Sequence, residues 1–240
     1  MPGDPVSPPL SEGAMAINRS RVDKVYEQVR TMATNFEFKP DERINEGALA
    51  GELGTSRTPL REALNRLVAE GFLTFHNGRG FFCRSLDPDQ ILGLYEARQA
   101  IECEALRLAV SRATDEEIAE VLRFLKDTET AYSSSSSSQE LVELDEAFHL
   151  RLVRMAKNRE LERILANVNA RIRYVRWIDM SERRSVTPAA HVRIAEALAA
   201  RDEALAVQEL RDHIGKRSEE ATQAVRTAYS QLYVPASAAS

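Results

Sequence analysis

Aspartate and histidine residues fall at helical spacing on apolar stripes in the second half of this chain. In the segment 139–156, Asp145 and His149 lie four residues apart on a helical face that also carries apolar residues. His191 and His213 lie beside apolar residues in two later segments. Burial of an unpaired carboxylate costs several kcal/mol, and a divalent cation removes this cost because carboxylates and neutral imidazoles are suitable ligands. The pattern predicts that these four residues bind one metal ion per chain.

An alternative interpretation is that each histidine is a hydrogen-bonded core residue, which is the better explanation for any one of them alone. The metal is favoured because three of the four histidines in the chain, with one carboxylate, fall on inward stripes of three predicted helices. Cys83 and Cys103 stand alone, so we expect them to pack in the interior rather than form a disulfide framework or a zinc knuckle.

A second group of residues has the chemistry to bind DNA. Arg57 and Arg61 lie one turn apart at the start of a predicted helix, from which they can reach guanine edges or phosphates in a major groove. Hydroxyls and free N–H groups at the same helix start suit phosphate oxygens. Arg79 lies at the tip of a predicted hairpin, where it can enter an adjacent minor groove. The predicted DNA-binding residues are Thr55, Ser56, Arg57, Thr58, Arg61 and Arg79.

The elements expected around these arginines decide against the simpler interpretation that they solvate a helix surface. A short helix is predicted over about 46–53, and the next helix begins after Ser56 and ends at Gly71. Two aromatic runs, 72–75 and 81–84, flank an Asn-Gly turn and predict a β-hairpin. With one preceding helix, these elements make a winged helix-turn-helix.

Everything beyond this domain is predicted to be helical. The fold class is therefore mainly α, with an N-terminal winged helix-turn-helix followed by an all-α helical-bundle effector domain. Six helices are expected in the bundle, over about 88–112, 115–131, 139–156, 159–180, 188–200 and 202–229. The predicted organisation is a disordered leader at 1–16, the DNA-binding domain at 17–84, a linker at 85–88, the effector domain at 89–230 and a flexible tail at 231–240.

The N-terminal domain resembles GntR-type bacterial transcription factors over its whole length. The resemblance is most specific in Leu53-Gly54-Thr55-Ser56-Arg57-Thr58-Pro59-Leu60-Arg61-Glu62-Ala63-Leu64. It implies that Arg57, Arg61 and the hairpin read a DNA operator. Gly47 stands where some relatives carry a DNA-contacting arginine, so their base preference cannot be transferred to this chain.

The C-terminal part, about 88–229, resembles the FCD ligand-binding domain of the FadR branch, and its six helices resemble the VanR-type variant. The matching positions are Asp145-Glu146-Ala147-Phe148-His149, His191 and His213-Ile214. The resemblance implies a divalent ion at these positions, zinc or nickel first, with manganese or iron as alternatives. It also implies a small organic acid whose carboxylate reaches the ion.

A second anchor for this acid is then expected at the end away from the metal. Arg98 is the first candidate, because it lies beside apolar residues on an inward face and a guanidinium binds a carboxylate bidentately. Asn169 and Trp177 are further candidates, for which ordinary helix packing is an equal alternative.

Composition and charge exclude several classes of protein. No apolar run approaches the roughly 18–20 residues of a membrane span, and the first residues lack the features of a signal peptide. We therefore expect a cytoplasmic, nucleoid-associated bacterial protein with no membrane partner. The net charge is −5, yet residues 17–84 hold 11 Lys and Arg against 9 Asp and Glu, so a mildly basic segment precedes an acidic one.

These features together predict a homodimeric, metabolite-responsive transcriptional regulator. It is expected to be a repressor that binds an inverted-repeat operator in double-stranded DNA and is released by a small carboxylate or sugar acid bound at the metal. Two alternatives stay open: a sensor in which the ion itself is the signal, and a metalloenzyme that activates water. The enzyme is disfavoured because no general base or nucleophile is evident beyond the metal ligands.

Overall fold

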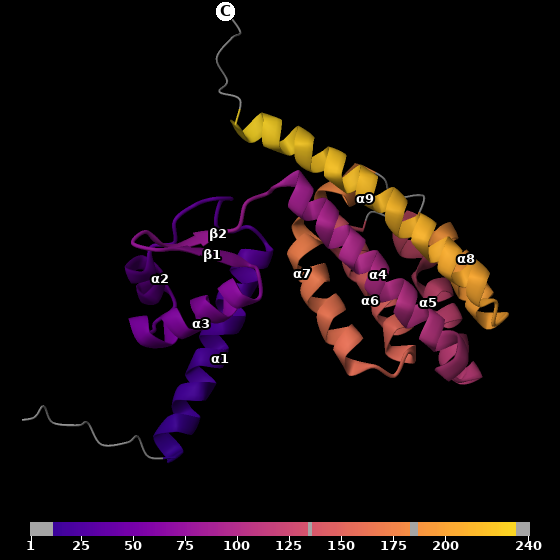
Figure 1. Cartoon of the computed structure of the whole chain (residues 1–240), viewed down its shortest axis with the longest axis horizontal. Helices are drawn as coiled ribbons and strands as arrows, with labels where there is room; N and C mark the ends of the chain where they lie inside the picture. The colour runs from indigo at the N-terminus through magenta and orange to yellow at the C-terminus, as the bar shows by residue number, and fades with distance from the viewer. Residues whose placement is uncertain (1–11, 134–135, 183–186, 234–240) are drawn as a thin grey trace, which may run out of the picture. The chain divides into compact units, whose positions relative to one another are not determined.

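The computed structural model describes residues 12–133, 136–182 and 187–233. The chain divides into two compact units between Ser85 and Leu86, a point inside the predicted linker (Figure 1). Helices make up most of both units, and the described strands form one two-stranded sheet. The predicted mainly α fold class is confirmed.

The N-terminal unit has the order helix, helix, helix, hairpin. Its elements are α1 (Glu12–Thr34), α2 (Glu46–Glu52), α3 (Arg57–Ala69), β1 (Leu73–His76) and β2 (Gly80–Cys83). The Asn45 side chain caps α2 by accepting hydrogen bonds from the N–H groups of Gly47 and Ala48, both at 3.1 Å. Gly54 adopts a φ of +59° in the turn to α3, a conformation that glycine adopts without steric cost. Ser56 occupies the N-cap position of α3, but its side chain makes no capping hydrogen bond.

The buried stripe of α3 anchors the unit, and the hairpin forms its wing. The stripe consists of Pro59, Leu60, Ala63, Leu64 and Leu67. The strands lie within one residue of the predicted ranges, with Leu73 opposite Cys83 and His76 opposite Gly80. Arg43, just before α2, forms a β-bridge to Phe82 and so ties the start of α2 to the wing.

The C-terminal unit is a helical bundle. Its helices are α4 (Pro88–Arg112), α5 (Asp115–Ser133), α6 (Ser138–Met155), α7 (Arg159–Glu182), α8 (Thr187–Ala199) and α9 (Glu203–Tyr233). Proline at the first position of α4 follows the capping carboxylate of Asp87, and a reciprocal Ser137–Glu140 capping box begins α6. No helix in the described ranges is both long and apolar enough to cross a membrane.

The packing of the bundle places α4 at its centre. α4 packs against α6, α7 and α9, and α8 packs against both α5 and α9. In Figure 1, α4 and α9 run side by side. One core cluster, made by Ala105, Val153, Ala156 and Leu165, joins α4 to α6 and α7. These contacts bring the inward stripes of α4, α6, α8 and α9 together, although they are far apart in the sequence.

Two helix ends differ from the predicted organisation. α1 begins at Glu12, so residues 12–16 of the predicted disordered leader are helical, because Ala14, Met15 and Ala16 favour helix and no proline interrupts them. α9 continues to Tyr233 and so includes the first residues of the predicted tail at 231–240. The rest of the leader and the rest of the tail lie outside the described residues.

Candidate metal centre and DNA-reading surface

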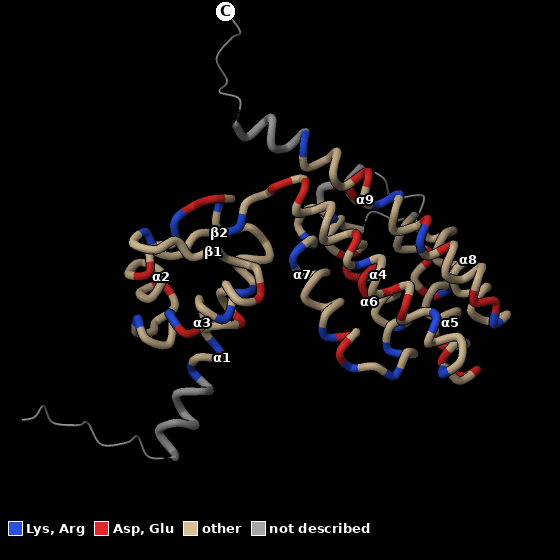
Figure 2. The backbone as a smooth tube through the Cα atoms, in the orientation of Figure 1, with Lys and Arg blue, Asp and Glu red and all other residues tan. Residues whose placement is uncertain are grey.

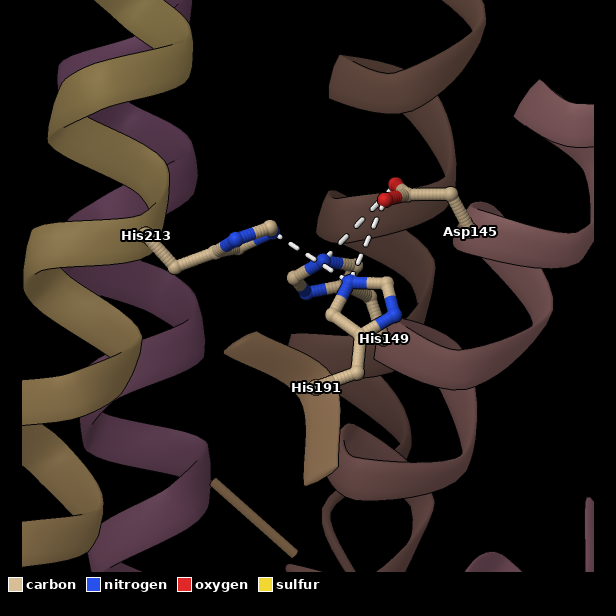
Figure 3. Close-up of side chains that lie close together, drawn as sticks. All are labelled: Asp145, His149, His191 and His213. Carbon is tan, nitrogen blue, oxygen red and sulfur yellow. Dashed lines mark hydrogen bonds and ion pairs between the residues drawn. The ribbon is translucent and has the colours of Figure 1, made fainter. Parts of the chain in front are cut away.

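The four predicted metal ligands converge in the interior of the C-terminal unit. Asp145 and His149 come from α6, His191 from α8 and His213 from α9, and their donor atoms all lie within 4.8 Å of one another (Figure 3). His191 Nε2 lies 3.2 Å from Asp145 Oδ1 and 3.3 Å from His213 Nε2. His149 Nε2 lies 3.7 Å from Asp145 Oδ2. Such spacings suit ligands that share one ion, since metal–nitrogen and metal–oxygen bonds are about 2 Å long.

The charge states of the cluster also suit a metal. Burial alone would raise the pKa of the Asp145 carboxyl, but the Arg176 guanidinium and the neighbouring His149 outweigh burial and hold that pKa well below its usual value. Burial lowers the pKa of His191 to about 4. Burial, together with the neighbouring imidazoles, lowers the pKa of His213 well below its usual value. At neutral pH the carboxylate is therefore charged and these two imidazoles are neutral, which are the metal-binding forms.

Glu102, on α4, orients one of the ligands. Its Oε2 accepts a hydrogen bond from His149 Nδ1 in the interior. Burial would raise the pKa of Glu102, but its interactions with His149 and Arg98 lower it to about 2, so the carboxylate stays charged. With Nδ1 protonated, His149 Nε2 carries the lone pair, and this buried atom has no hydrogen-bond partner among the described residues. A carboxylate behind a ligating histidine is a recurrent feature of metal sites. The residues present therefore fit a divalent ion.

Arg98, the first candidate for the acid anchor, lies at the metal cluster rather than away from it. The side chain is 2% exposed, its Nε donates to Glu102 Oε1 at 2.6 Å, and its Nη2 lies 3.8 Å from Asp145 Oδ2. Within the described part of the chain, Nη2 has no hydrogen-bond partner. The i, i+4 pairing with Glu102 holds the guanidinium beside the predicted ligands, and the role of Arg98 toward an acid stays a prediction.

Arg176, on α7, is a second residue that the sequence did not single out. It is buried and pairs with Asp145, and its Nη1 lies 3.2 Å from Glu146 Oε1. Arg173 pairs with the same Glu146 carboxylate. This arrangement neutralises the two carboxylates that stand side by side on α6. Its sequence signal is weak, because arginines are frequent along α7 and most of them would be expected at the surface.

The other candidate anchors also lie in the interior. Asn169 Oδ1 and Trp177 Nε1, both on α7, are buried and have no hydrogen-bond partner in the described chain. The same holds for Ser218 Oγ and Thr222 Oγ1 on α9, which the sequence analysis did not identify. Buried polar atoms usually have partners, so these atoms mark places where a polar ligand would gain hydrogen bonds.

Two cavities flank α8 and reach the cluster from the surface. The first, between α5 and α8, has a volume of about 580 Å³ and is lined by apolar side chains together with Lys126, Thr128, Glu129, Tyr132 and His191. The second, between α8 and α9, has a volume of about 420 Å³ and reaches His213 and Lys216. Each cavity therefore borders one histidine of the cluster, on one side of α8.

Three of the predicted DNA-binding residues lie together in the first turns of α3. Arg57, Thr58 and Arg61 are exposed and line a pocket of about 730 Å³. The pocket also includes Arg43, Asn45, Glu46, Gly47 and Gly80, which the sequence analysis did not assign to DNA binding. Charges of both signs are spread along each unit (Figure 2), so the placement of arginines, rather than a large excess of them, makes this pocket basic.

The remaining predicted DNA-binding residues lie in two turns, one before α3 and one in the hairpin. Ser56 is exposed and Thr55 half-buried in the turn before α3. Arg79 is exposed in the turn between β1 and β2, with its guanidinium carbon 5.3 Å from the centre of the Phe82 ring. A hydroxyl-bearing helix start, two α3 arginines and a basic wing tip therefore belong to one compact unit.

Comparison with known families covers both units. The description "Bacterial regulatory proteins, gntR family" matches residues 21–83, and the FCD domain matches residues 93–216. The FCD match contains all four predicted metal ligands, together with Arg98 and Glu102.

Several curated proteins are similar along most of the chain. The Nta operon transcriptional regulator of Aminobacter aminovorans is 43% identical over 84% of this chain and 95% of its own length. The uncharacterized HTH-type regulator YdhC of Bacillus subtilis is 33% identical over 78% of this chain and 85% of its own. The HTH-type transcriptional repressor GlaR of Escherichia coli is 30% identical over 74% and 84%, respectively.

Solved structures have the same fold. A GntR transcriptional regulator from Rhodococcus sp. RHA1 matches with a TM-score of 0.67 at 22% identity, over 85% of this chain and 98% of its own. E. coli McbR/YncC matches with a TM-score of 0.61, also at 22% identity, over 88% and 98%. At this identity the likeness concerns the fold alone.

Proposed function

The chain belongs to the gntR family of bacterial regulatory proteins and carries an FCD domain, and we propose that it is a repressor released by a small organic acid bound at a divalent metal ion. It is a transcriptional regulator rather than an enzyme, as are the relatives named above. GlaR is named a repressor, which supports repression as the mode of action.

The observation that carries this proposal is the buried cluster of one carboxylate and three imidazoles. Its members are Asp145, His149, His191 and His213. Without a cation, the interior would hold His191 and His213 with their Nε2 atoms 3.3 Å apart and a buried His149 Nε2 that has no hydrogen-bond partner in the described chain, which is costly. A divalent ion, with zinc or nickel before manganese or iron, would be held by all four donors and would bind a carboxylate at its open positions.

We assign the acid to the neighbourhood of the ion, where Arg98 Nη2 lies 3.8 Å from Asp145 Oδ2 and has no hydrogen-bond partner in the described chain. This guanidinium would donate to a carboxylate that also reaches the ion. Asn169 and Trp177 stay candidates on α7 for further contacts with the acid, because a buried acceptor and a buried donor there have no partner in the described chain. An acid with hydroxyl or further carboxylate groups would satisfy more of these atoms than a simple fatty acid, so we assign the effector to polar organic acids.

A second candidate function is a metal sensor, in which the ion alone is the signal. It is favoured by the number of protein donors, since four ligands complete a tetrahedral zinc site and leave no position for an acid. The two functions differ in the coordination of the ion: an acid-responsive regulator needs a five- or six-coordinate ion.

On the DNA side, we propose that two copies of the chain bind the two halves of an inverted repeat. The symmetry of a homodimer then matches the symmetry of the operator. The start of α3 enters the major groove, and Arg79 reaches the adjacent minor groove. A protein with this task acts in the cytoplasm, on the nucleoid.

The test begins with the natively purified protein. Elemental analysis identifies the metal, and mass spectrometry identifies small acids released on denaturation. A duplex selected by the protein from a random library then serves as the operator in fluorescence anisotropy titrations. The repressor proposal expects operator affinity to fall when the released acid is added to the metal-loaded protein. An affinity that responds to metal alone, without acid, favours the sensor. A protein that binds neither metal nor acid would overturn both.

A further inference from the structure

The DNA-reading pocket contains one carboxylate among several guanidinium groups. Its lining residues include Arg43, Arg57, Arg61 and a single acidic residue, Glu46, at the first position of α2. A carboxylate on a surface that meets phosphates weakens non-specific attraction to DNA, since binding there depends on cationic side chains. The Glu46 carboxylate therefore has a role other than binding of phosphate.

The contacts of Glu46 indicate what that role is. Its Oε2 lies 3.3 Å from Arg61 Nε, with the Glu46 side chain only 24% exposed and that of Arg61 55% exposed. The guanidinium carbon of Arg61 also lies 5.9 Å from the centre of the Phe81 ring on β2. Arg61 is thus held between α2 and the wing, while its contact with Glu46 is made through Nε. The two terminal nitrogens, which form the fork that binds guanine, lie beyond this contact.

Gly47, the next residue of α2, leaves room for the guanidinium of Arg57, the other arginine at the start of α3. A Cβ added at Gly47 would lie 3.3 Å from Arg57 Nη2, closer than ordinary van der Waals contact. Since this atom is the end of a flexible side chain, a larger residue at 47 would displace the guanidinium rather than unfold the unit. The Asn45 cap, which accepts from the Gly47 N–H group, fixes both residues at the start of α2.

We propose that Glu46 and Gly47 determine DNA sequence specificity by positioning the two arginines of α3. Glu46 holds the Arg61 guanidinium toward a base edge and keeps it from pairing with a phosphate, and Gly47 leaves the space that Arg57 occupies. The proposal rests on the proposed DNA-reading role of α3. The preferred sequence of this chain then depends on α2 as well as on α3.

The same helix offers matched controls for both residues. Glu52, at the end of α2, is exposed and does not line the pocket, so Glu52→Gln removes an equal charge without touching Arg61. Gly51 has open space around its Cβ position, so Gly51→Gln adds the same side chain to the same helix as Gly47→Gln without a clash. Thermal melts of all four full-length variants report whether they are folded.

The experiment compares two DNA probes at one salt concentration. The first is the duplex that the wild-type protein selects from a random library, and the second is a shuffled duplex of equal composition. We expect Glu46→Gln to lower the ratio of the affinity for the selected duplex to that for the shuffled duplex about tenfold. Affinity for the shuffled duplex should stay the same or rise, because a misplaced arginine loses base discrimination but keeps its charge. Gly47→Gln should lower the ratio to a similar extent. Glu52→Gln and Gly51→Gln should leave the ratio unchanged.

A double mutant separates positioning from direct contact with a base. If Glu46 acts through Arg61, Glu46→Gln should have no further effect on the ratio in an Arg61→Ala background. The proposal is overturned if Glu46→Gln costs as much without Arg61 as with it, or if either α2 variant behaves like its control. If the wild-type protein enriches no common sequence from the random library, the DNA-reading role of α3 itself is overturned. If the wild-type protein enriches a consensus sequence but the α2 variants behave like their controls, only the positioning role of Glu46 and Gly47 is overturned.

Discussion

The two units of this regulator hold their proposed functional residues in opposite environments. In the N-terminal unit, Arg57, Arg61 and Arg79 are exposed, and the apolar stripe of α3 lies behind them. In the C-terminal unit the four cluster residues are at most 8% exposed, and His149 is fully buried. DNA is too large to enter a protein, so its reader must be a surface, whereas an ion and a small acid bind best where water is excluded.

This difference determines how each unit responds to change. An exposed arginine can be removed with little effect on stability, because surface substitutions rarely exceed about 0.5 kcal/mol. A buried ligand belongs to the core, and removing it leaves its charged neighbours without a partner. Substitution of an exposed arginine in the N-terminal unit should therefore change DNA binding alone. Substitution of a cluster residue should change both stability and function. Four predictions test this contrast, from the largest expected effect to the smallest.

The largest effect is expected from His149→Ala. The variant should lose the metal, and with it the stabilisation that a metal bound only to the folded state provides, about 4 kcal/mol when the metal is present at 1,000 times its Kd. It should also lose the acid response but keep operator binding, because the reading unit is separate. Elemental analysis and thermal melts measure the first two effects. His76→Ala, at the exposed histidine of β1, serves as the control and should keep both metal and stability. A full equivalent of metal in His149→Ala would show that the histidines are core residues.

A smaller effect in the same unit is expected from Glu102→Gln. The amide oxygen still accepts from His149 Nδ1, but it no longer carries the charge that strengthens the imidazole as a ligand. Metal affinity should fall by about 10- to 100-fold, the usual range for residues behind a ligand, as measured by competition with a chelator. Glu104→Gln, at an exposed residue of α4 that pairs with Arg107, is the control. Equal metal affinity in the two variants would contradict the role given to Glu102.

In the N-terminal unit, substitutions at the start of α3 should lower operator affinity without lowering stability. Arg57→Ala or Arg61→Ala should cost about 1–3 kcal/mol of operator binding if the side chain reads a base, with no change in the melting temperature. Arg66→Ala is a suitable control, because Arg66 lies on the same helix but pairs with Asp23 and stacks on Tyr26. Unchanged affinity in folded Arg57→Ala and Arg61→Ala proteins would remove α3 as the reader.

The smallest effect is expected from Arg79→Ala and appears in the salt dependence. The logarithm of the operator binding constant should fall steeply with the logarithm of salt concentration, because arginines release counterions from DNA. Loss of one cationic contact should reduce this slope by about 1, and Lys24→Ala on α1 should leave it unchanged. A flat salt response in the wild-type protein would contradict the whole interface.

The sequence predicted the mainly α fold and the four cluster residues because both depend on local periodicity. Asp145 and His149 share a helical face whatever surrounds them, because they lie four residues apart. Polar residues on an otherwise apolar helical face can be recognised from the sequence alone. The arginines at the start of α3 were identified in the same way, from a short run with its own turn and cap signals. Helix ends were less predictable, as at Glu12 and Tyr233, because a nearby Gly13 or Pro235 locates a helix end only to within a few residues.

Tertiary structure alone decided which residues surround these side chains. Glu102 looks like half of an ordinary i, i+4 pair with Arg98, and only the packing of α4 against α6 places it behind His149, 47 residues away in sequence. Arg176 meets Asp145 only because α7 packs on α6. Periodicity reports which face of a helix is buried, but it carries no information about which other helix covers that face. The partners of a buried charge are therefore set by packing between helices, and the tertiary structure is needed to name them.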